Sequence, residues 1–233
     1  LLATLALFTA QSLTSGHGGL FLALALAILF TSALTTKIIR PGKVVGDCGL
    51  AGALLLLINV PFVIPYYEVR ERVELTRSIE DAEGWTPTAS SWLLSPTRTQ
   101  SLVLSKVAPL APDVESANAS LFPGFVFLGL TGLGLFGLIR HRESRTSGGL
   151  GLAVLALITL WLALGPAFGV YRLAYSIFPG FDLIRVPSRF FLLTLTAMAA
   201  LAALGLDRIR RRGVAWTLIA LATIECLPLP WSA

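Results

Sequence analysis

The sequence predicts an all-α protein: a polytopic bundle of about seven transmembrane helices with one mixed extracytoplasmic loop region. Two observations support this prediction. First, 55% of the 233 residues are hydrophobic and only 13% are charged, which is too little charge to cover the surface of a soluble domain of this length. Second, many basic residues gather in short connectors between apolar segments, as they do in membrane proteins.

Seven apolar segments approach the ~20 residues that a helix needs to cross a bilayer. They lie near residues 1–14, 18–36, 48–66, 122–139, 149–167, 189–206 and 213–229. The chain therefore divides into helices 1 to 3 (1–66), an extracytoplasmic loop region (67–121) and helices 4 to 7 (122–233), the last part containing a second outer loop at 168–188. The sequence opens without Met in an apolar run, so we expect a piece of a longer protein that lacks an N-terminal part.

The basic residues predict which side of the membrane each connector faces. The connectors after the second, fourth and sixth segments carry 10 of the 18 Lys and Arg: Lys37, Arg40, Lys43, Arg140, Arg142, Arg145, Arg208, Arg210, Arg211 and Arg212. These connectors share one side if every segment crosses once, and the positive-inside rule assigns that side to the cytoplasm. Loops 67–121 and 168–188 are then extracytoplasmic. The net charge of +5 needs no nucleic-acid partner.

The outer loop 67–121 holds 8 of the 13 acidic residues. Its first part, from Glu68 to Glu83, fits either a surface helix or an edge strand. The adjacent pair Glu80-Asp81 could serve as a general base or bind a divalent metal with a diphosphate, but a solvated surface pair is the favoured interpretation. The sequence shows no cofactor motif. Glu225 is a further candidate, because acids near apolar helices are often functional.

The most suggestive polar stretch lies between the fifth and sixth segments and contains Asp182, Arg185 and Arg189. We expect Pro187 to set the start of the sixth helix, with Ser188 close to the cap position. Arg189 would then lie at the outer mouth of that helix and Arg185 just above it. Guanidinium groups beside a helix N-terminus suit a phosphate. Arginines that extend to lipid headgroups, with Asp182 paired to one of them, explain the pattern about equally well.

Arg172 and Tyr175 belong to the same outer connector. They could help to hold a lipid phosphate or a sugar. An interfacial aromatic belt with one anchoring arginine is the favoured interpretation of this pair.

Several short motifs together resemble a known class of membrane enzymes. They are Trp92-Leu93-Leu94-Ser95-Pro96, Leu121-Phe122-Pro123-Gly124-Phe125, Gly165-Pro166, Tyr175 and Phe178-Pro179-Gly180-Phe181-Asp182-Leu183-Ile184-Arg185-Val186-Pro187-Ser188-Arg189-Phe190. This pattern resembles bacterial polytopic proteins of the GT-C glycosyltransferase type, and within them the YfhO-type and related uncharacterised members. The likeness runs from roughly residue 60 to 206.

The resemblance implies an enzyme that moves a sugar from a polyprenyl-phosphate donor to an acceptor on the outer face of the membrane. Its essential acid is usually in a first outer loop near the N-terminus, which this sequence does not contain, so no catalytic residue is assigned. Only Arg185 and Arg189 carry over, as candidate donor-phosphate contacts. The expected partners are the bilayer and the lipid-linked sugar donor. The alternative is a non-enzymatic protein of lipid or polysaccharide export that binds the same carrier, and a purely structural subunit is a third reading.

Overall fold

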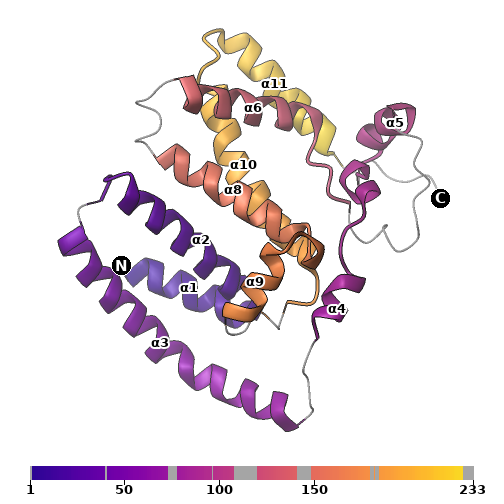
Figure 1. Ribbon diagram of the computed structural model, residues 1–233. Helices are drawn as coiled ribbons and strands as arrows, with labels where there is room; N and C mark the ends of the chain where they lie inside the picture. Colours follow the sequence, from indigo (N-terminus) through magenta and orange to yellow (C-terminus); the bar gives the residue numbers. More distant parts are fainter. Residues whose placement is uncertain are drawn as a thin grey trace.

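The structure is a computed structural model that describes residues 2–39, 41–72, 78–95, 97–107, 120–140, 148–178, 181 and 184–227. The described part is all-helical, with 82% helix and no strands (Figure 1). Its longer helices are α1 (Leu2–Thr14), α2 (Gly16–Thr35), α3 (Pro41–Arg72), α6 (Phe125–Arg140), α8 (Leu150–Ala163), α10 (Phe191–Leu206) and α11 (Arg212–Cys226). Its shorter elements are α4 (Ile79–Gly84), η1 (Ala89–Leu93), α5 (Arg98–Val107), η4 (Pro166–Phe168), α9 (Val170–Ile177) and η6 (Pro187–Phe190).

The prediction of an all-α fold is confirmed, and each of the seven apolar segments coincides with one of the seven longer helices. Two stretches among the described residues are long and apolar enough to cross a membrane, Gly18–Thr35 and Pro187–Leu206. The helices α6 and α8 are apolar but shorter. Among the described residues, helix length and composition therefore support two candidate spans.

Two parts of the chain are more helical than their composition predicts. Helix α3 begins at Pro41 and ends at Arg72, so it extends beyond the expected 48–66 at both ends, because polar residues continue a helix as readily as apolar ones. Proline suits the first helical position, since its missing N–H has no partner there in any case. The open choice for residues 68–83 is settled as helix where described: after α3, the short α4 starts at a capping box between Ser78 and Asp81.

Helix α10 is the centre of the bundle and packs against both α6 and α8. Its contact with α6 brings the two backbones together: a Cβ built on Gly134 would lie 2.9 Å from the carbonyl carbon of Leu201. The reciprocal position is Gly205, whose Cβ would lie 2.9 Å from the amide nitrogen of Gly134. Glycine is therefore required at this crossing, as in closely packed transmembrane helices.

Threonine hydroxyls also connect these helices. Thr159 of α8 and Thr194 of α10 are hydrogen-bonded at 2.9 Å, and both are fully buried. Thr131 of α6 donates to the carbonyl of Met198 at 3.3 Å and to Phe127 of its own helix. Each hydroxyl can bond within its own helix, so pairing between helices adds specificity without leaving a polar atom unsatisfied.

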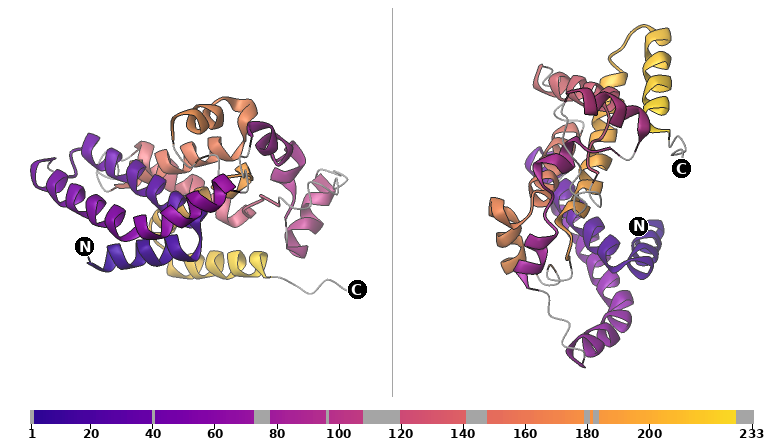
Figure 2. Two further views of the ribbon diagram at one scale, coloured as in Figure 1. Left: turned by 90° about the horizontal axis from the view of Figure 1, so that it is seen from below. Right: turned by 90° about the vertical axis from the view of Figure 1, so that its right-hand side faces the viewer.

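The described connectors that are rich in basic residues lie at one end of the bundle. The last turn of α6 touches the residues after α10, because a Cβ at Gly137 would overlap the guanidinium of Arg208. The last turns of α2 meet the first turn of α8, where a Cβ on Gly151 would lie 3.1 Å from Ser32 Oγ. Helix α11 lies at the periphery in both views of Figure 2, and none of its residues is buried.

Candidate lipid-phosphate site

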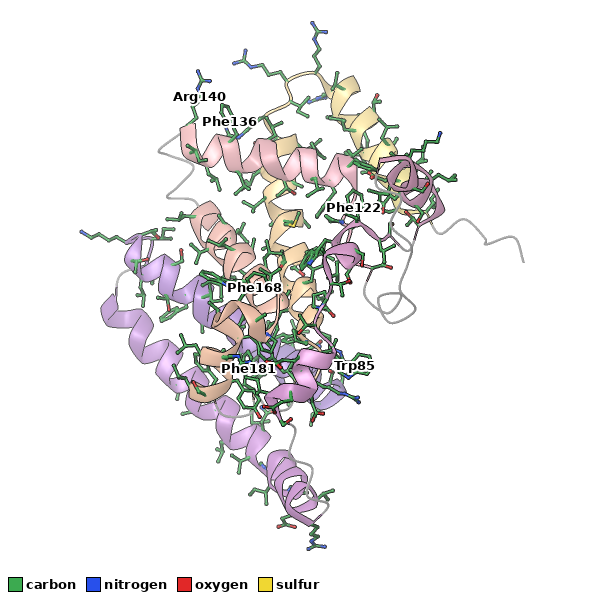
Figure 3. The ribbon with its side chains drawn as sticks, turned by 45° about the vertical axis from the view of Figure 1, so that its right-hand side comes forward. Trp85, Phe122, Phe136, Arg140, Phe168 and Phe181 are labelled. Carbon is green, nitrogen blue, oxygen red and sulfur yellow. The ribbon has the colours of Figure 1, made fainter. Side chains whose placement is uncertain are left out.

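An aromatic cluster at the other end of the bundle fixes the polar stretch in space. The rings of Phe181 and Phe190 stack with their centroids 5.3 Å apart, and Tyr171 of α9 meets Phe181 edge-on at 5.3 Å. Phe21 of α2 contacts Phe190 at 4.9 Å. Tyr171 and Phe190 have no exposed surface. Phe181 and Trp85 lie at this end, opposite Phe136 and Arg140 (Figure 3).

One hydrogen bond ties the backbone of the polar stretch to this cluster. The hydroxyl of Tyr171 donates to the carbonyl of Ile184 at 2.6 Å, and both residues are buried. Burial raises the pKa of Tyr171 above its ordinary range, so the hydroxyl stays protonated and remains a donor at physiological pH. The residue directly before Arg185 is thus held in place.

Tyr171→Phe is expected to lower the free energy of unfolding by about 1–3 kcal/mol, because the buried carbonyl of Ile184 loses its partner. The measurement is the thermal unfolding midpoint of the protein in detergent. Thr196→Val is the control: Thr196 is exposed, and its hydroxyl bonds to Leu192 within the same helix. If both variants shifted the midpoint equally, the hydrogen bond of Tyr171 would not stabilise the fold more than an exposed one does.

Of the two arginines of the predicted site, Arg185 directly precedes the turn η6 that leads into α10, and Arg189 lies within that turn. Val186 is the N-cap of η6, Pro187 occupies its first turn, and η6 leads directly into α10. The start at Pro187 agrees with the sequence prediction, whereas the cap is two residues before the expected Ser188. Arg185 and Arg189 are both exposed. They project from a turn whose neighbours Ile184 and Phe190 are buried.

Arg185 lies over the indole ring of Trp85, with its guanidinium carbon 4.6 Å from the ring centroid. Trp85 is the C-cap of α4 and is 40% exposed. A cation–π contact at an exposed site contributes ~0.5–1 kcal/mol and leaves the edge of the guanidinium available for hydrogen bonds. The contact therefore orients Arg185 without using up its donors.

Arg172 has a different environment from the other two arginines. Its Nη2 pairs with the carboxylate of Glu83 in α4, and its Nε donates to the carbonyl of Pro166 at 3.3 Å. The side chains of Arg172 and Glu83 are 54% and 43% exposed, so the pair contributes ~1 kcal/mol at most. Arg172 thus connects α4 with η4, the short turn between α8 and α9. Tyr175 is half-buried against the aromatic cluster, and Asp182 lies outside the described residues.

Sequence reasoning did not identify Trp85 as a contact of the site. Tryptophan is common at membrane–water interfaces, so its presence alone does not predict a contact with an arginine. The pairing of Trp85 with Arg185 joins residues 100 positions apart in the chain. No local spacing signals such a pair. The same applies to Glu83, whose pairing with Arg172 is decided by how α4 docks rather than by its own neighbours.

Glu225 has a structural role in the described fold. Its two carboxylate oxygens accept hydrogen bonds from the backbone amides of Phe125 and Val126, the second at 3.1 Å. These are the first free N–H groups of α6, where a negative charge is also favourable for the helix dipole. Glu225 therefore caps α6 from α11, and both of its oxygens are engaged.

The remaining acids near the site do not form a metal centre. Asp81 accepts from the amide of Ser78 in the capping box of α4. Hydrogen bonding to its own backbone amide, followed by Ser78, lowers the pKa of the exposed Glu80 carboxyl, so this group stays ionised at neutral pH. Across the described ranges, no group of three or more His, Cys, Asp and Glu is arranged to hold a metal ion.

Comparisons of the chain with family models, with curated proteins and with solved structures found no match.

Proposed function

We propose that this chain is the carrier-binding part of a GT-C-type membrane glycosyltransferase that uses a polyprenyl-phosphate-linked sugar on the extracytoplasmic face. Arg185 and Arg189 are the donor-phosphate contacts. The observation that carries the proposal is the placement of these two exposed arginines on a turn locked by buried neighbours at the start of α10. Groups that are fixed before the substrate arrives stabilise a developing phosphate charge without reorganisation.

We propose further that all seven longer helices cross the membrane, in a bacterial plasma membrane with residues 67–121 and 168–188 outside. Large apolar side chains on the outside of the bundle support this, including Leu57 (72% exposed), Ile139 (71%) and Trp216 (69%). Water would disfavour so many exposed apolar groups, whereas lipid accepts them. Helix α6 has 16 residues and a length of about 24 Å, so tilt, local thinning or its flanking residues must accommodate the remaining bilayer thickness.

In this proposal the reaction is an inverting displacement at the anomeric carbon of the sugar. The acceptor hydroxyl attacks that carbon, its proton passes to a base, and the bond to the carrier phosphate breaks. Arg185 and Arg189 stabilise the phosphate that leaves. The base is expected outside this chain, in the upstream loop that the family resemblance implies.

One observation favours the alternative, a non-enzymatic carrier-binding protein of lipid or polysaccharide export. Glu83 pairs with Arg172, and Asp81 accepts a bond in the cap of α4. Two carboxylates of α4, the helix whose C-cap Trp85 contacts Arg185, thus have structural partners and are poorly placed to act as a base. The alternative needs the arginines but no base.

The full-length protein carrying Arg185→Gln and Arg189→Gln is expected to lose at least about tenfold in affinity for polyprenyl phosphate, because each charge-assisted bond contributes ~1.5–3 kcal/mol. Binding of radiolabelled polyprenyl phosphate in lipid vesicles measures the loss. Lys106→Gln, an exposed residue of α5, is the control for lost charge. Unchanged binding in the double variant would contradict the assigned role, and sugar transfer by the intact protein separates the enzyme from the non-enzymatic alternative.

A further inference from the structure

A second group of arginines lies at the opposite end of the bundle from Arg185 and Arg189. Arg140 ends α6, and Arg210, Arg211 and Arg212 lead into α11. All four side chains are exposed. In the connector 207–211, Asp207 is the sole acid. Because this connector holds three arginines against one aspartate, it carries a net positive charge, to which Arg140 and Arg212 add.

Packing brings the end of α6 and the connector after α10 together. A Cβ at Gly137 would overlap the guanidinium of Arg208, so glycine at this position gives the arginine room to lie against the last turn of α6. One turn further, Arg140 lies over the ring of its helix neighbour Phe136, 5.9 Å from the centroid. The end of α6 and the connector after α10 thus form one cationic surface, and Figure 3 shows Phe136 and Arg140 on it.

The surface continues directly into exposed apolar side chains. Ile139 is 71% exposed on α6, while Val214 (46%) and Trp216 (69%) are exposed on α11. Arg212 and Trp216 are four residues apart and share a face of α11. A cationic rim above exposed aliphatic groups and a tryptophan is the arrangement that fits a phospholipid, whose headgroup is anionic and whose chains are apolar.

We propose that this end of the bundle, formed by Arg140, Arg210, Arg211, Arg212 and Trp216, binds anionic phospholipid headgroups of the leaflet that it faces. The inference rests on the proposed membrane placement and is independent of the carrier site. A nucleic acid fits less well, since its phosphates would have to approach across exposed apolar side chains. Phospholipid satisfies both parts of the surface at once.

The test uses the full chain in lipid nanodiscs that contain phosphatidylglycerol and phosphatidylcholine in equal amounts. Native mass spectrometry counts the lipids that remain bound to the protein after release. We expect preferential retention of phosphatidylglycerol. The variant with Arg210→Gln, Arg211→Gln and Arg212→Gln should lose about tenfold or more of this preference, because each basic residue near an anionic surface contributes about a fivefold factor. The matched variant with lysine at all three positions should keep most of it.

Helix content by circular dichroism confirms that each variant is folded before the lipids are counted. Equal preference in the glutamine variant and the parent protein would overturn the inference, as would loss of preference in the lysine variant. If the protein inserts and binds polyprenyl phosphate but shows no preference for phosphatidylglycerol, only this inference fails. A chain that does not insert overturns both this inference and the proposed function.

Discussion

Gly134→Ala is expected to destabilise the helix bundle by about 3 kcal/mol, at the upper end of the cost of overpacking a tight contact. The new methyl group would lie 2.9 Å from the carbonyl carbon of Leu201 and closer still to its oxygen. Backbone atoms cannot rotate away as a side chain can, so α6 and α10 would have to separate. Thermal unfolding in detergent, followed by loss of the monodisperse peak in size-exclusion chromatography, measures the effect.

Gly132→Ala is the matched control on the same helix. Apart from its chain neighbours and the backbone of its own helix, no described atom lies within 4 Å of the position that its Cβ would take, and alanine favours the helix by up to ~1 kcal/mol over glycine. This variant should be neutral or slightly more stable than the parent protein. If the two variants had the same midpoint, the close approach of α6 and α10 would be wrong.

Phe190→Ala should cost about 3–5 kcal/mol, the usual range for removing a fully buried aromatic side chain. The ring of Phe190 has no exposed surface and meets Phe21, Phe181 and Tyr171. Its loss leaves a cavity where α2, α9 and the start of α10 converge. Because Arg189 precedes it directly, the variant should also weaken binding of polyprenyl phosphate, which is measured beside the unfolding midpoint.

Phe178→Ala is the control for this substitution. Phe178 follows α9 and is 52% exposed, so the same truncation removes few protein contacts and should change the midpoint only slightly. If Phe178→Ala lowered the unfolding midpoint strongly and Phe190→Ala only slightly, the described packing of the aromatic cluster would be wrong.

The sequence predicts the longer helices well because the length and hydrophobicity of each apolar segment indicate a helix without reference to any other part of the chain. All seven segments lie where longer helices form, and Pro187 marks the start of the last polar turn before α10. Local chemistry decides both features: hydrophobic length in the first case and the fixed φ of proline in the second. The exposed positions of Arg185 and Arg189 follow from the same local argument.

Contacts between distant residues could not be predicted in this way. Glu225 caps a helix that begins 100 residues earlier, and Arg172 pairs with Glu83 across 89 residues. The residues next to Glu225 or Glu83 in the chain give no indication of these distant partners. The expected segment 48–66 is shorter than α3 for another reason. The ends of α3 contain polar residues, and these show where an apolar segment ends but not where a helix ends.

The glycine crossing of α6 and α10 has a mechanical consequence. Helix α10 carries the turn of Arg189 at one end and Arg208 just beyond the other, and between them it is in backbone contact with α6 at Gly134 and Gly205. A rotation or slide of α10 alone would drive a carbonyl into a neighbouring backbone. We therefore expect the turn of Arg189 to move only when α6 and α10 rock together, with α11 following because Glu225 is hydrogen-bonded to the start of α6.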